Sequence, residues 1–176
     1  MSKAQLKKYL QTLPHEQIVQ VVLDLYDARK AAKEYLEFYM DPDAAKAVEN
    51  AKKAVLKVFY TPQGHIRAKV RAKDASDIVA DFLKLQTDSE YMADLYLFHV
   101  EVILSWLCNR RIIRETAWNS VVSLFRKAAD YLAATDNLVK LQPRIEKIMK
   151  FCHVAPEYLR VPQRLRQELE EAKSNN

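Results

Sequence analysis

The chain of 176 residues contains a single glycine, Gly64. Tight β-hairpin turns and phosphate-cradling loops depend on glycine, because glycine adopts positive φ without a steric penalty. One glycine therefore argues against an all-β fold, a dinucleotide-binding fingerprint and a P-loop. With 49% hydrophobic and 29% charged residues, the composition is that of a globular chain. Together these features predict an all-α fold whose turns are built from Asp, Asn, Pro and Thr.

The longest apolar run is EYMADLYLFHVEVILSWLC, residues 90–108. On a helix, its acidic residues fall on one narrow strip, and large apolar side chains fill about two thirds of the circumference. A helix this apolar must be covered by neighbours on most sides. We therefore expect it to be the central helix of a single domain spanning residues 1–176, in which seven or eight helices pack as antiparallel hairpins around residues 90–108.

The pattern leaves three local questions open. Residues 15–41 form either one long helix or two, because no Gly or Pro interrupts them but a polar patch lies at residues 27–30. Pro143 marks either a kink or the start of a helix. Residues 65–73 (HIRAKVRAK) alternate apolar and basic residues, which predicts a short extended connector that passes into a helix between Arg71 and Asp77.

Charge and cysteine content narrow the functional classes. The net charge of +5 and the pI near 9.1 favour nucleic-acid binding only weakly, because the excess is spread along the chain. The two cysteines have no CxxC spacing, so we expect neither a zinc site nor a disulfide framework, and no cofactor. The N-terminus lacks a signal-peptide core, and residues 95–107 are too short to cross a bilayer. A cytoplasmic protein without membrane contact is the expectation.

The acidic strip of residues 90–108 consists of Glu90, Asp94 and Glu101. Carboxylates on one helical face can coordinate metals in carboxylate-rich bundles. Those sites use Glu-x-x-His pairs, and no histidine of this chain has a carboxylate three residues before it. We therefore favour a solvated edge of the helix, or ion pairs with Lys and Arg of neighbouring helices.

His99 lies on the opposite side of this helix from the acidic strip. A buried histidine can act as a general base beside a ligand pocket, which would make the protein an enzyme or a ligand binder. A hydrogen-bonded core histidine is the favoured interpretation. Cys108 lies on the acidic side and is too far round the helix to pair with His99, whereas a pair between Cys152 and His99 across helices stays open.

The basic residues Arg67, Lys69, Arg71 and Lys73 alternate along the predicted connector, and Arg110, Arg111 and Arg114 form a second basic segment. Such a row can follow nucleic-acid phosphates. No aromatic residues are interleaved for base stacking, and the alternative is an ordinary solvated connector.

Large parts of the chain resemble an uncharacterised bacterial all-α family of about 170–180 residues. The resemblance rests on the segments IVADFLKL, ADLYLFHVE and ETAWNSVVSLFRKAADYL, and on LKKYLQTLPHEQIVQVVLDLY and AKEYLEFYMDP nearer the N-terminus. Because the family is a domain of unknown function, the resemblance implies the fold and no activity. No functional residue is carried over from it.

The absence of a catalytic constellation favours a non-enzymatic helical scaffold or protein-interaction domain. The nine tyrosines agree with this hypothesis, since tyrosine suits half-buried contact surfaces. The expected partner is another protein or a second copy of the chain. Nucleic-acid binding through residues 67–73 is the first alternative, and a ligand or enzymatic pocket near His99 is the second.

Overall fold

The computed structural model describes residues 2–175, and the chain falls into two compact units, Met1–Asp43 and Ala44–Asn176. The single domain expected over residues 1–176 stays a prediction, and the two units are described one at a time. The all-α class is confirmed: the described residues form nine α-helices and no strand beyond an isolated bridge between Tyr60 and Ile66. Nine helices compare with the seven or eight expected.

The first unit contains α1 (Lys3–Thr12), α2 (His15–Ala28) and α3 (Lys30–Met40). Ser2 caps α1: its hydroxyl accepts from the Gln5 backbone N–H, and the Gln5 side chain accepts from the Ser2 backbone N–H. Arg29 is extended, with φ −137° and ψ 112°, and separates α2 from α3. Residues 15–41 are therefore two helices. None of the described residues of this unit is buried.

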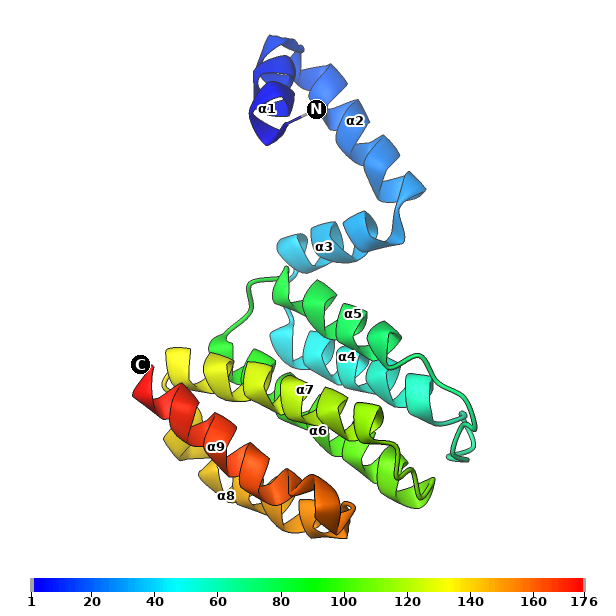
Figure 1. The fold of residues 1–176 in the computed structure, drawn as a ribbon. Coiled ribbons are helices and arrows are strands. Elements are labelled where there is room, and N and C mark those ends of the chain that lie inside the picture. The colour runs from blue at the N-terminus through cyan, green and yellow to red at the C-terminus, as the bar shows by residue number, and fades with distance from the viewer. Residues whose placement is uncertain (1, 176) are drawn as a thin grey trace. The chain divides into compact units, whose positions relative to one another are not determined.

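The second unit contains the remaining six α-helices, which are α4 (Ala44–Phe59), α5 (Ala72–Leu83), α6 (Ser89–Asn109), α7 (Glu115–Ala134), α8 (Leu138–Phe151) and α9 (Val161–Ser174). Two 3₁₀ turns, Cys152–Val154 and Glu157–Leu159, connect α8 to α9. In Figure 1, α4 and α5 lie along one side of α6, and α8 and α9 lie along the other. Pro143 lies inside α8, which begins five residues earlier.

The predicted central helix is α6, which packs against α4, α5, α7 and α8. Ten of its residues are buried, among them Leu95, Leu104 and Leu107. By length and hydropathy α6 could cross a membrane, but 61% of its most apolar window is buried inside the unit. Packing against neighbouring helices therefore accounts for its apolar character.

With one glycine available, four turns place other residues in the left-handed region. These are Gln86, Arg111, Asp136 and Arg160, with φ between 48° and 56°. Gly64 takes φ 81° in the loop after α4. The turns thus use costly conformations that glycine would adopt freely, and the packing of the helices that they join holds them in place.

Candidate functional site

The acidic strip of α6 is neutralised by cations from neighbouring helices. Arg144 of α8 forms a bidentate ion pair with Glu101, at 2.7 Å from Nε to Oε1 and 2.7 Å from Nη2 to Oε2. Its Nη1 donates to Asp94. Lys52 of α4 reaches the other oxygen of Asp94 at 2.6 Å. The strip therefore joins α4, α6 and α8 through ion pairs.

These contacts change how easily the groups ionise. Burial by itself opposes the charge on Asp94, but the hydrogen bonds from Lys52 and Arg144 outweigh it, so the pKa of Asp94 lies below its ordinary value. Burial likewise opposes the charge on Arg144, and its bonds to Glu101 and Asp94 raise its pKa. Asp94 and Arg144 are thus held in their charged forms, which suits the pair to holding α6 and α8 together.

Glu90 belongs to a different part of the same strip. It pairs with Lys140 at 2.5 Å, and both side chains are more than half exposed. The two residues line a cavity of about 610 Å³ together with Asp88, Ser89, Tyr91, Asp94, Asn137 and Leu141. The buried amide of Asn137 donates to the Ser89 hydroxyl at 3.1 Å and to Thr135.

No group of three His, Cys, Asp or Glu side chains within residues 2–175 is placed to hold a metal ion. Glu90 and Asp94 line the same cavity, whereas Glu101 does not line it and is bound to Arg144. Carboxylates already paired with Lys and Arg offer a metal no ready ligand set.

His99 lies in the apolar core with 1% of its surface exposed. Neither ring nitrogen has a hydrogen-bond partner among the described residues, so the sequence-based expectation of a hydrogen-bonded core histidine is wrong. Burial lowers the pKa of His99 to about 4, which keeps the ring neutral at pH 7. The residue lines neither of the two cavities described for this unit.

The two thiols are also unsuited to nucleophilic chemistry. Cys152 is fully buried, and burial together with nearby Cys108 raises the pKa of its thiol to about 12. Burial also raises the pKa of Cys108. The possible pairing of Cys152 with His99 is not formed, because neither nitrogen of His99 bonds to any described atom. Both thiols stay protonated at neutral pH.

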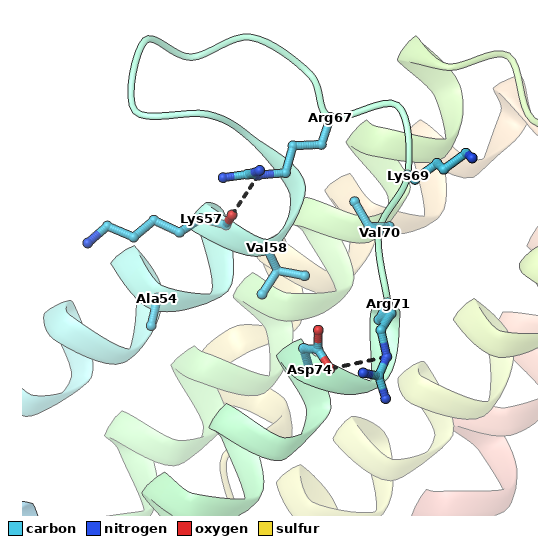
Figure 2. Close-up of a pocket in the computed structure, with 8 residues that line it drawn as sticks. All are labelled: Ala54, Lys57, Val58, Arg67, Lys69, Val70, Arg71 and Asp74. Atoms are coloured by element: carbon cyan, nitrogen blue, oxygen red, sulfur yellow. Dashed lines mark hydrogen bonds and ion pairs between the residues drawn. The ribbon is translucent and has the colours of Figure 1, made fainter. Parts of the chain in front are cut away.

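The basic connector forms a loop between α4 and α5 and borders a shallow pocket, shown in Figure 2. The pocket has a volume of about 490 Å³ and is lined by Ala54, Lys57, Val58, Arg67, Lys69, Val70, Arg71 and Asp74. Three of the four predicted nucleic-acid contacts, Arg67, Lys69 and Arg71, therefore border one pocket. Lys73 is exposed in the first turn of α5 and is not part of the lining.

Lys57 also lines this pocket, although no pattern in the sequence groups it with the connector. It lies near the end of α4, ten residues before Arg67. The Arg67 Nε donates to the Lys57 carbonyl at 3.0 Å and to the Tyr60 carbonyl at 3.2 Å. The return of the chain from α4 brings the two residues together, and no local periodicity predicts that return.

The first unit exposes many large apolar side chains. On α2 they include Val19, Val21, Val22, Leu23 and Leu25, each 40–51% exposed. Leu6 and Tyr9 of α1 and Tyr35, Tyr39 and Met40 of α3 are exposed as well. The sequence shows these residues on helix faces but cannot show whether anything covers them. In the structure of this unit, nothing buries them.

A family model described as "Family of unknown function (DUF6155)" matches residues 1–157. The match includes all of the first unit and most of the second. Neither a curated protein nor a solved structure matches the chain.

Proposed function

The chain belongs to DUF6155, a family of unknown function, and from its own structure we propose that it is a protein-interaction module that self-associates through α1–α3. The observation that carries the proposal is the exposure of the first unit. Its three helices contain no buried residue among those described, although α2 alone presents five large aliphatic side chains to solvent. A surface of this kind typically marks an interaction site.

The distribution of apolar residues on α2 is too wide for an ordinary surface helix. At about 100° per residue, its apolar side chains cover an arc of about 200°. The polar arc holds Glu16, Gln17, Gln20, Asp24 and Asp27. One neighbouring helix covers only part of such an arc. The uncovered part is a surface against which α2 of a second copy can pack.

The small size of the first unit also favours self-association. The first unit ends at Asp43, and chains of about 40 residues rarely hold a stable core without oligomerisation, metals or disulfides. Neither cysteine lies in this unit. Covering the apolar arc with another subunit would supply the missing buried surface.

Charge complementarity supports a second copy as the partner. α1 carries three lysines, Lys3, Lys7 and Lys8, and no acidic residue. α2 carries three acidic residues, Glu16, Asp24 and Asp27, and no lysine or arginine. In a two-fold dimer, α1 of each copy can lie against α2 of the other, so the same complementary contact occurs twice.

The test introduces charge into the apolar arc. Sedimentation velocity of the full chain across a hundred-fold concentration range should show a dimer. We expect the double variant Val22→Glu, Leu25→Glu to be monomeric, because it would bury carboxylates in the interface. The matched control Gln17→Glu, Gln20→Glu adds the same charge to the polar arc and should remain dimeric.

A charge-swap experiment identifies the partner. The variants Lys7→Glu, Lys8→Glu and Asp24→Lys, Asp27→Lys should each dimerise more weakly alone, while an equimolar mixture should form heterodimers. A wild-type chain that is monomeric at every concentration would refute self-association. So would a mixture that dimerises no better than either variant alone.

A further inference from the structure

The first basic segment is held against the end of α6 that leads into the second basic segment. The loop after α4 is fixed to the C-terminal part of α6, because the Tyr60 and Ser105 hydroxyls lie 3.0 Å apart and Trp106 Nε1 donates to the Arg67 carbonyl at 2.9 Å. Arg110 follows Trp106 by one helical turn and so lies on the same side of α6. Arg67 and Arg110 are therefore both hydrogen-bonded to Trp106, at the same end of the unit.

The cations of this end are exposed and have few acidic neighbours. Lys57 and Lys69 form no ion pair within residues 2–175, and the only carboxylate in the pocket lining is Asp74, which lies 3.7 Å from Arg71. Glu115 follows the second basic segment. The excess of positive charge is spread evenly along the sequence, but the fold concentrates part of it at this end. A concentrated excess of this kind attracts a polyanion.

Arg67 is preorganised to bind an anion. Its Nε is occupied by the backbone carbonyls of Lys57 and Tyr60, which orient the guanidinium group. Its two terminal nitrogens make no hydrogen bond or ion pair within residues 2–175, so the outer edge of the guanidinium remains for a ligand. Arginine presents paired donors that match the oxygens of a phosphate group.

The spacing of the cations indicates a ligand with several phosphates. In Figure 2, Lys57 and Lys69 extend in opposite directions, with Arg67 between them. A single phosphate would be bound by converging side chains, whereas a row of phosphates matches cations spread along a rim. The apolar residues of the pocket lining are Ala54, Val58 and Val70, and the lining includes no aromatic ring for base stacking.

We propose that this basic end of the second unit binds the phosphodiester backbone of nucleic acid through Lys57, Arg67, Lys69 and Arg71, without reading the base sequence. Backbone contacts of this kind position a protein on nucleic acid but carry no sequence information. All four residues belong to the second unit, and none belongs to α1–α3.

The test measures binding of the full-length chain to a fluorescein-labelled single-stranded oligonucleotide of about 20 nucleotides, by fluorescence anisotropy at 50–200 mM salt. Four phosphate contacts predict a slope of log K against log salt of about −3 for a single strand. Two oligonucleotides of unrelated sequence should bind within about three-fold of each other, because the site contacts no base edges.

The variant Lys57→Gln, Lys69→Gln, Arg71→Gln removes three charges from exposed side chains. It should weaken binding about ten-fold or more at low salt and make the salt slope shallower by about 2. The control Lys127→Gln, Lys147→Gln, Lys150→Gln removes the same charge from exposed positions on α7 and α8. It should bind within about two-fold of the wild type, and circular dichroism should show both variants folded.

Four results would overturn the proposal. The first is no binding by the wild-type chain at 50 mM salt, and the second is an equal loss of affinity in the control variant. The third is displacement of the oligonucleotide by poly-glutamate at the same concentration of charge, which would show that phosphate is not recognised. Displacement by millimolar inorganic phosphate would point to a single-phosphate site and would equally contradict a backbone site.

Discussion

Replacing His99 with leucine tests the reasoning about the core of α6. The histidine is 1% exposed, and both ring nitrogens lack hydrogen-bond partners among the described residues. Leaving a buried polar group unsatisfied costs about 1–3 kcal/mol. Leucine has a similar volume and no polar atoms, so His99→Leu should raise the free energy of unfolding at pH 7 by about 1–3 kcal/mol.

The pH dependence gives a second and independent readout. Burial lowers the pKa of His99 from 6.5 to about 4, so the unfolded chain binds this proton more readily than the folded protein. The contribution of neutral His99 to the free energy of unfolding is therefore fully present above pH 6.5, and it is lost as the pH falls toward 4. With these two pKa values, linkage predicts a loss of about 2 kcal/mol between pH 7 and pH 5.

Urea unfolding followed by tryptophan fluorescence measures both effects, since Trp106 and Trp118 lie in the same unit as His99. The wild type and a control variant, His153→Leu at an exposed histidine, should lose this stability between pH 7 and pH 5. His99→Leu should not. The reasoning fails if the His99 variant keeps the pH dependence, or if it is destabilised by about 2 kcal/mol or more at pH 7.

Three further predictions concern the second unit. Arg144→Ala should lower the free energy of unfolding by about 1–3 kcal/mol, because it leaves Glu101 and Asp94 without their shared cation; Lys140→Ala removes an exposed pair and should cost under about 1 kcal/mol in the same urea titration. Phe125→Ala should cost about 3–5 kcal/mol, since the ring is 1% exposed, and thermal unfolding by circular dichroism would show it. Cys152 should resist iodoacetamide at pH 8 in the folded protein and react once urea unfolds it, because its pKa is raised to about 12; rapid labelling of the native chain, read by mass spectrometry, would contradict its burial.

Much of the fold follows from local patterns in the chain. The single glycine excluded hairpin-rich architectures, and the apolar circumference of residues 90–108 identified α6 as a covered helix. The break at Arg29 was not decided by the pattern, because both one helix and two fit the same apolar spacing. The extended conformation of Arg29 is a property of the folded chain, and local propensity predicts such interruptions poorly.

The candidate site residues also were predicted only in part: the sequence shows which residues share a helix face, but not their partners on other helices. Glu90, Asp94 and Glu101 were found from helical spacing, but their partners Lys52, Arg144 and Lys140 come from other helices and no periodicity links them. His99 was expected to have a hydrogen-bond partner, and the structure gives it none. Hydrogen bonds between helices depend on the rotation and spacing of the packed elements, which a single sequence does not specify.

The sequence by itself determined the all-α class, the identity of the core helix, and the positions of the acidic strip and of the basic segments, because these follow from residue type and from the 3.6-residue period. Only the tertiary structure decided which of these features meet. It brought Lys57 and Arg67 to one pocket, joined the acidic strip to cations of α4 and α8, and left the apolar faces of α1–α3 uncovered within their own unit. Proximity between distant segments arises from packing, and packing is a property of the whole chain.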